Sequence, residues 1–346
     1  MSEAIEHSSG DETTMSRTSA RARRALWVAA AAFLLAACTG PSADTGSEKP
    51  APDSGGVDSA APLDFAVITH GSEGDAFWSV VQNGAQDAAR DLGVKVSYLA
   101  DGDPGAQSKL IDNAVAQGKT GLVVSMANPD ALKSSIEAAV RAGIPVITIN
   151  SGADRSAEFG ALAHVGQDEA VAGRAAGERL KDEGRKKVLC VIHEAGNSGL
   201  NDRCEGAKEG FGGNVTNLQV DVANPTDAEA RIRGALQTDP SIDGVLTLNS
   251  QVADRAVAAA AAAGSAAEVA TFDLNTDVVK SIQDGKILFA VDQQQYQQGY
   301  LPVVMLKLYR DNGNTLGGGE PVFTGPGFVD RSNADQVETY TERGTR

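Results

Sequence analysis

Polar side chains follow most of the short apolar runs in this sequence. They lie in seven segments, at residues 70–78, 125–128, 150–152, 193–194, 249–251, 273–275 and 292–295. About half of these amides, carboxylates and hydroxyls are expected to be helix N-caps, a position that Asn, Asp and Ser prefer. Capping explains the aromatic pair Phe77 and Trp78 less well, because two large rings enter one helix at the same place.

Nucleophilic, metal and phosphate chemistry have little support in these segments. Cys190 and His193 could serve as nucleophile and base, but strand alternation puts them on opposite faces and no orienting acid is evident. Three cysteines and four histidines are too few for a zinc ribbon or a multi-histidine centre. The glycine-rich loop at residues 71–74 lacks the lysine and spacing of a phosphate cradle. We therefore predict no catalytic residue, no metal and no cofactor.

The elements that must position the polar segments alternate between strand and helix. Apolar, β-branched runs lie at residues 65–69, 94–99, 122–125, 146–149, 188–192, 215–220, 245–248, 269–272 and 287–291. Residues with helical spacing separate most of these runs, and such alternation is typical of parallel sheets covered on both faces. Nine or ten strand–helix units are more than a single open sheet usually contains. The sequence thus predicts an α/β fold of two doubly wound sheets, with ligands beyond the carboxyl ends of the strands.

Length, composition and charge narrow the functional classes. The chain has 346 residues, of which 42% are apolar, so it can bury a full-sized core. Its 46 acidic side chains outnumber the 30 basic ones and give a net charge of −16. An acidic chain with no basic stripe is unsuited to nucleic acid and to electrostatic docking on anionic lipid.

The first 61 residues predict an export signal and a tether. Arginines precede an apolar run at residues 25–37, which has the proportions of a signal-peptide core, and Met15 is a credible true start. Residues 35–38, which read LAAC, resemble the bacterial lipobox, and this implies cleavage before Cys38 and a diacylglyceryl thioether on it. Residues 38–61 have almost nothing to bury and are expected to be disordered. We expect lipid anchoring on the outer face of the cell membrane, the alternative being an ordinary signal with a chance cysteine.

Two further cysteines remain in the body of the chain. Cys190 is expected in a strand and Cys204 at the start of the next helix. In an exported protein this favours a disulfide that ties the strand to the helix, with two buried free thiols as the alternative.

The ordered set of segments resembles the ribose-type periplasmic sugar-binding proteins, the solute receptors of sugar ABC importers. The likeness extends from about Leu63 to Val329. Residues 145–150 read PVITIN and resemble the family's PVIT strand, and residues 202–206 resemble its arginine-bearing helix start. Residues 293–299, QQQYQQG, resemble the family's last crossover.

The resemblance implies a set of ligand-binding residues. Its aromatic pair stacks on the sugar, and its strand ends, arginine and last crossover bind hydroxyl groups. Carried over to this sequence, the set is Asp75, Phe77, Trp78, Ser125, Asn150, Arg203, Asn249, Asp273 and Gln293. The family usually has Asp followed by Arg where this chain has Asn150 and Ser151, which changes the expected sugar but not the ligand class.

The resemblance also implies two lobes joined by a three-strand hinge. The N-terminal lobe is expected to hold residues 62–167 and 294–324, and the C-terminal lobe residues 168–293 and 325–346. The implied function is non-enzymatic: a monomeric receptor that closes on a monosaccharide or polyol and delivers it to a membrane permease. A nucleoside or sugar-like signal receptor of the same fold is the alternative. A repressor with this fold would need an N-terminal DNA-binding motif, where this sequence has a signal peptide.

Overall fold

The computed structural model describes residues 62–72 and 74–346. Cys38, the lipobox and the tether predicted before residue 62 lie outside the described residues. Within the described part of the chain, no helix combines the length and the apolar character needed to cross a membrane.

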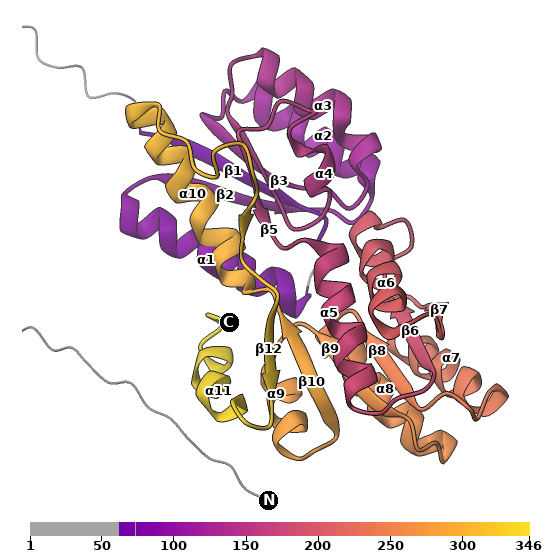
Figure 1. The fold of residues 1–346 in the computed structure, drawn as a ribbon. Coiled ribbons are helices and arrows are strands. Elements are labelled where there is room, and N and C mark those ends of the chain that lie inside the picture. Colours follow the sequence, from indigo (N-terminus) through magenta and orange to yellow (C-terminus); the bar gives the residue numbers. More distant parts are fainter. Residues whose placement is uncertain (1–61, 73) are drawn as a thin grey trace, which may run out of the picture. The chain divides into compact units, whose positions relative to one another are not determined.

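Two six-stranded sheets form the framework of the described body (Figure 1). The first has the order β11 (Val322–Phe323), β5 (Ala163–Gly166), β4 (Val146–Ile149), β3 (Gly121–Ser125), β1 (Asp64–Thr69) and β2 (Lys95–Ala100). The second has the order β12 (Gly327–Asp330), β10 (Ile287–Asp292), β9 (Glu268–Phe272), β8 (Gly244–Thr247), β6 (Val188–Ile192) and β7 (Val215–Gln219). The order β2-β1-β3-β4-β5 in the first sheet matches β7-β6-β8-β9-β10 in the second. The predicted pair of doubly wound sheets is confirmed, except that the edge strand β12 runs antiparallel to β10.

Helices cover both faces of each sheet, because successive strand residues are apolar and point to opposite sides. On the first sheet, one face packs against α1 (Ala76–Leu92) and α10 (Gln295–Asn312), and the other against α2 (Pro104–Ala116), α3 (Pro129–Arg141) and α4 (Ala153–Ser156). On the second, one face packs against α5 (Glu169–Asp182) and α6 (Ser198–Phe211). Its other face packs against α7 (Pro225–Thr238), α8 (Ser250–Ala263), α9 (Thr276–Gln283) and α11 (Ala334–Glu342). We call the part built on the first sheet the N-lobe and the part built on the second sheet the C-lobe.

One helix pair in each lobe packs with its backbones nearly in contact. A Cβ on Gly299 of α10 would lie 1.9 Å from the carbonyl oxygen of Val81 on α1. A Cβ on Gly173 of α5 would lie 2.2 Å from the carbonyl oxygen of Arg203 on α6. Each glycine therefore permits an approach that no other residue could, and the two helices of each pair are held together as a unit.

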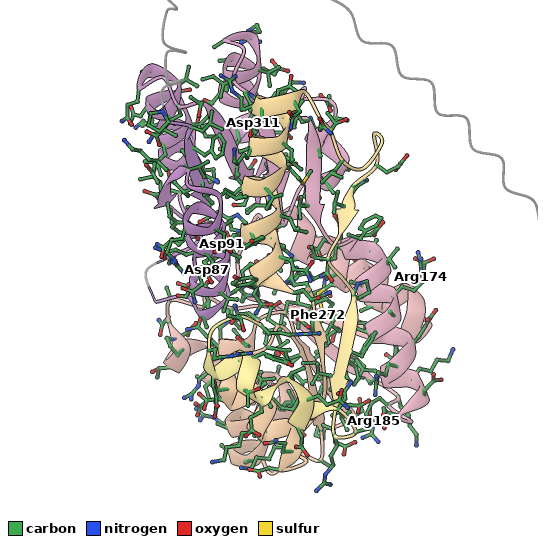
Figure 2. The ribbon with its side chains drawn as sticks, turned by 90° about the vertical axis from the view of Figure 1, so that its left-hand side faces the viewer. Asp87, Asp91, Arg174, Arg185, Phe272 and Asp311 are labelled. Carbon is green, nitrogen blue, oxygen red and sulfur yellow. A yellow bond between two sulfur atoms is a disulfide. The ribbon has the colours of Figure 1, made fainter. Side chains whose placement is uncertain are left out.

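Tyrosine–aspartate hydrogen bonds reinforce the pair in the N-lobe. The hydroxyl of Tyr296 donates to Asp87, and the hydroxyl of Tyr300 donates to Asp91, each at 2.9 Å. Figure 2 shows both aspartates on the side of α1 that faces α10. The two tyrosines lie one turn apart on α10 and the two aspartates one turn apart on α1, so the two bonds fix the register of one helix on the other.

The chain crosses between the sheets three times, after β5, after β10 and between β11 and β12. The crossings lie side by side. The backbone N–H of Thr324 donates to the carbonyl of Gly166 at 2.6 Å, and the side-chain amide of Gln294 donates to the carbonyl of Thr324 at 2.7 Å. Three bonded crossings allow the lobes to rotate about this hinge but resist their sliding apart.

Candidate functional site

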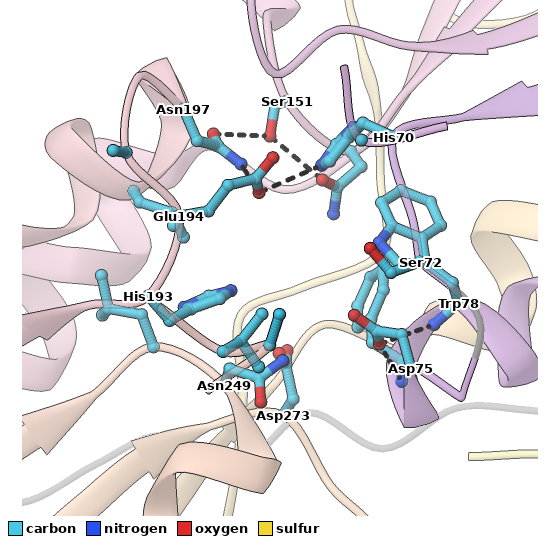
Figure 3. A pocket seen from close by; sticks show the side chains of 18 of the residues that line it. His70, Ser72, Asp75, Trp78, Ser151, His193, Glu194, Asn197, Asn249 and Asp273 are labelled. Atoms are coloured by element: carbon cyan, nitrogen blue, oxygen red, sulfur yellow. Dashed lines mark hydrogen bonds and ion pairs between the residues drawn. The ribbon is translucent and has the colours of Figure 1, made fainter. Parts of the chain in front are cut away.

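A cavity of about 400 Å³ lies between the lobes, beyond the carboxyl ends of strands from both sheets (Figure 3). The N-lobe contributes residues from the segments after β1 and β4, and the C-lobe contributes residues that follow β6, β7, β8 and β9. The volume falls within the range of roughly 300–1,000 Å³ that is usual for small-molecule sites.

The cavity brings together eight of the nine residues that the sequence put forward. These are Asp75, Phe77, Trp78, Asn150, Arg203, Asn249, Asp273 and Gln293. Ser125 is the exception, because it is the last residue of β3 and not part of the loop beyond it. Its side chain is fully buried, and its hydroxyl contacts the backbone N–H and the ring Nδ1 of His70 at 3.0 and 2.7 Å.

Aromatic rings and one carboxylate form the N-lobe wall. Phe77 and Trp78 meet edge to face with centroids 4.9 Å apart, and His70 packs edge to face on Trp78 at 4.7 Å. Asp75 caps α1 by accepting the backbone N–H groups of Phe77 and Trp78 at 2.9 and 3.3 Å, so it is both a cap and a cavity residue. Burial raises the pKa of Asp75 against the lowering effect of these two bonds. The cap therefore fixes where both rings enter the cavity.

Arg203 is held in a buried ion pair on the C-lobe side. Its Nε and Nη2 donate to the two carboxylate oxygens of Glu169 at 2.6 and 2.9 Å, and its Nη1 donates to the carbonyl of Leu248 at 3.3 Å. The guanidinium also lies over the ring of Phe272, 4.7 Å from its centroid. Arg203 thus reaches the cavity in a fixed orientation and with its charge already balanced.

Asn150 and Asp273 occupy equivalent positions in the two lobes, directly after β4 and β9. Both have left-handed backbones, with φ of 63° and 69°, and both donate their backbone N–H to the next strand, to Val165 and Val291. Non-glycine residues adopt this conformation at a cost, and such residues gather at functional sites. Here the turn directs both side chains into the cavity.

Gln293, in the second crossing, links these two side chains. Its amide N–H donates to Asp273 at 2.6 Å, and its carbonyl oxygen accepts from the amide of Asn150 at 3.2 Å. Asp273 is only 3% exposed, and burial raises the pKa of its carboxyl to about 7, although Arg203 and Gln293 favour the charged form. The hinge therefore contributes directly to the cavity.

Several lining residues lie in segments that the strand-end rule marks but that the resemblance does not single out. They are His70, Ser72, Ser151, His193 and Glu194. Asn197, the N-cap of α6, also lines the cavity but lies outside those segments. His193 has a buried Nδ1 without a hydrogen-bond partner, and burial lowers the pKa of its ring to about 3. The ring is therefore neutral at neutral pH.

The lobes touch each other along one side of the cavity. The hydroxyl of Ser151 in the N-lobe donates to Asn197 in the C-lobe at 3.2 Å. The backbone N–H of Ser198 donates to the carbonyl of Ala127 at 3.0 Å, again from the C-lobe to the N-lobe. The cavity therefore has contributions from both sides and direct bonds across its rim.

A disulfide joins Cys190 on β6 to Cys204 on α6. Both half-cystines are fully buried, and Cys204 is the neighbour of Arg203. Cys204 lies in the middle of α6 and not at its start, where the sequence predicts it, so the bridge ties the body of the helix to the strand that precedes His193 and Glu194.

Comparisons with known proteins agree with this architecture. The family model described as a periplasmic binding protein domain matches residues 65–314. A carbohydrate transporter from Acidothermus cellulolyticus 11B, solved in complex with myo-inositol, is 45% identical with a TM-score of 0.81, covering 83% of this chain and 100% of that chain.

More distant relatives of known role extend the comparison. The ribose import binding protein of Haemophilus influenzae is 27% identical over 255 residues, 71% of this chain and 85% of the relative. The D-apiose import binding protein of Paraburkholderia graminis is 27% identical over 296 residues, 83% of this chain and 93% of the relative. The chain belongs to the periplasmic binding protein family and is a binding protein, not an enzyme.

Proposed function

We propose that this chain is the solute-binding component of an ABC importer and that its cargo is an uncharged monosaccharide or cyclic polyol. The observation that carries the proposal is the composition of the cavity, in which an aromatic wall from one lobe faces a ring of hydrogen-bonding groups from both. The family membership and the import binding proteins among the relatives support the transport role.

The two halves of the cavity suit the two kinds of surface on a cyclic polyol. The ring's C–H groups pack on the face of Trp78 by dispersion and by attraction to the negative π face. Its hydroxyls bond to the carboxylate, amide and guanidinium groups of Asp273, Asn249 and Arg203. Specificity arises because a buried polar group left without a partner costs about 1–3 kcal/mol.

The charges around the cavity favour a neutral ligand. Four carboxyl groups of the described residues line it, those of Asp75, Glu194, Asp221 and Asp273. Among the described residues that line it, Arg203 is the only Lys or Arg, and Glu169 already balances its charge. A sugar phosphate or sugar acid would have to give up its hydration without a free cation in return.

Myo-inositol is the first candidate within this class. The solved relative that is 45% identical to this chain was crystallised in complex with it. A cyclitol presents hydroxyls around its whole ring, which suits a cavity with polar groups from two lobes. Ribose and D-apiose, named for the import binding proteins at 27% identity, are the next candidates.

We further propose that the protein is a monomeric lipoprotein on the outer face of the cell membrane. In this proposal residues 1–37 are removed, Cys38 carries the lipid, and residues 38–61 tether the lobes to the membrane. The LAAC sequence before the tether supports it. The lobe boundaries near residues 167, 293 and 324 are proposed from the sequence and from the three crossings.

The proposal is tested by titration calorimetry on the chain from residue 39 onward, without the lipid-bearing cysteine. The panel contains myo-inositol, ribose, apiose, glucose, glucose 6-phosphate, glucuronate and two nucleosides. We expect micromolar or tighter binding of one neutral polyol or sugar and none of the phosphate or the sugar acid. Binding of a nucleoside alone, or of an anionic sugar in preference to its neutral parent, would overturn the assignment.

A further inference from the structure

The side chain of Ser125 contacts His70, one of the residues that line the cavity. Its hydroxyl oxygen lies 3.0 Å from the backbone N–H of His70 and 2.7 Å from the ring Nδ1 of the same residue. Ser125 is fully buried, and His70 is 7% exposed. Within the described part of the chain, its hydroxyl has no other hydrogen-bond partner.

The chemistry of the three groups fixes which of them donate. The backbone N–H of His70 can only donate, so the hydroxyl oxygen of Ser125 accepts there. The hydroxyl proton then has one acceptor within reach, the ring Nδ1 of His70. If Nδ1 carried its own proton, the hydroxyl proton would be buried without a partner, which costs about 1–3 kcal/mol. Nδ1 therefore accepts, and the ring proton resides on Nε2.

The surroundings of the ring are consistent with a neutral imidazole. Burial lowers the pKa of His70, and the nearby Arg203 lowers it further, while Glu194 opposes both. Trp78 packs edge to face against the ring and restrains its plane. His70 thus presents one N–H, from Nε2, and the ring cannot turn without losing the bond to Ser125.

That N–H faces Glu194 from the opposite lobe. Nε2 of His70 lies 3.8 Å from the carboxylate of Glu194, which is longer than a hydrogen bond, and Figure 3 shows the two side chains approaching each other at the edge of the cavity. Glu194 is oriented by Asn197, whose amide donates to the same carboxylate oxygen at 2.9 Å. A donor on the N-lobe therefore faces an acceptor on the C-lobe.

We propose that His70 and Glu194 are a specificity-determining pair bridged by one ligand hydroxyl, and that Ser125 is the positioning residue that keeps His70 a donor. This inference rests on the proposed function. A hydroxyl accepts from His70 and donates to Glu194 at once, at a separation of about 4.6 Å for ordinary bond lengths. A ring oxygen or a methyl ether in the same place accepts from His70 but offers no donor to Glu194, whose carboxylate then keeps only the bond from Asn197. The pair therefore selects a free hydroxyl, and the 3.8 Å between the two groups in this structure must widen to admit it.

The positioning step is tested without any ligand, by ¹⁵N-resolved NMR of the histidine side chains in the chain from residue 39 onward. His70→Gln identifies the signals of His70. We expect a protonated Nε2 and an accepting Nδ1 in the parent and in Ser125→Thr, and a mixture of tautomers in Ser125→Ala. A proton on Nδ1 of the parent would overturn the role of Ser125, whatever the protein binds.

The specificity step is tested by calorimetry with the polyol that binds best in the panel and with its single-position deoxy and O-methyl analogues. We expect Glu194→Ala and His70→Gln each to lower the affinity for the parent polyol about tenfold or more. Each should also reduce the loss of affinity that O-methylation causes at one and the same hydroxyl of the polyol. Ser125→Ala should weaken binding in the parent protein but add little in the His70→Gln background. Fully additive effects of Ser125→Ala and His70→Gln, or a penalty that neither variant alters, would refute the pair. If no polyol binds, the proposed function fails, while the NMR result still decides the positioning step.

Discussion

Asp273 makes the stability of this protein depend on pH in a direction opposite to that of most carboxylates. Burial raises the pKa of its carboxyl from an ordinary 3.8 to about 7, since Arg203 and Gln293 only partly offset the loss of hydration. Between these two values the folded protein holds more protons than the unfolded chain. Its unfolding free energy therefore falls as the pH rises from about 4 to 7, and at higher pH the loss remains.

The size of the effect follows from the interval between the two pKa values. At about 1.4 kcal/mol for each pH unit, an interval of roughly three units corresponds to about 4 kcal/mol. This is an upper value, because water entry and lobe opening relieve some of the burial. Asp273→Asn removes the titration, keeps the size of the side chain and can still bond to Gln293.

The assay is urea unfolding of the parent and of Asp273→Asn at pH 4, 5, 6, 7 and 8. We expect the stability of the variant, relative to the parent, to rise by about 2–4 kcal/mol between pH 4 and 7. Asp112→Asn on the exposed surface of α2 is the matched control and should show no such trend. A difference between parent and Asp273→Asn that is the same at every pH would refute the reasoning.

The other predictions concern the aromatic wall, the buried ion pair and the disulfide. Trp78→Ala should abolish measurable polyol binding in calorimetry and, because the 7% exposed ring is also part of the N-lobe core, lower the unfolding free energy by about 3 kcal/mol. Unchanged affinity would exclude Trp78 from the site. Glu169→Gln should cost about 3 kcal/mol in urea unfolding because Arg203 stays buried without its counter-charge, and an unaltered midpoint would contradict this. Alkylation without reductant should add no mass to the chain from residue 39 onward, whereas two adducts would place free thiols at Cys190 and Cys204.

The sequence predicts most of the fold because β1, β3, β4, β6, β8, β9 and β10 are largely buried on both faces and read as apolar runs, while the edge strands β2 and β7 are more exposed. Three strands lack such a run, and each has a local reason. β5 contains a histidine and a glycine within four residues, β11 has only two residues, and β12 is an antiparallel edge strand with one fully buried side chain. Tertiary pairing, and not local composition, forms these strands.

The site is predictable to the extent that strand ends determine it. Asn150 and Asp273 follow their strands directly, and Asn and Asp adopt a left-handed backbone more readily than other non-glycine residues, but the same residue types also cap helices, so the sequence alone does not identify the turn. Sequence reasoning misses Glu169, because it pairs with a residue 34 positions away on another helix. It puts Ser125 in the cavity because the strand-end rule does not distinguish the last residue of a strand from the first beyond it.

The turns at Asn150 and Asp273 have the same backbone conformation but carry side chains of different polarity. Both residues donate their backbone N–H to the neighbouring strand, so the backbone has the same arrangement at this point in the two lobes. The side chains break that equivalence: one copy presents a neutral amide, and the other an acid that gains or loses a proton near pH 7. Exchanging the two residues would keep both backbone bonds and move the titrating acid from the C-lobe to the N-lobe. These two side chains, together with the aromatic wall of the N-lobe and Arg203 of the C-lobe, therefore make the two halves of the cavity chemically different for a bound molecule.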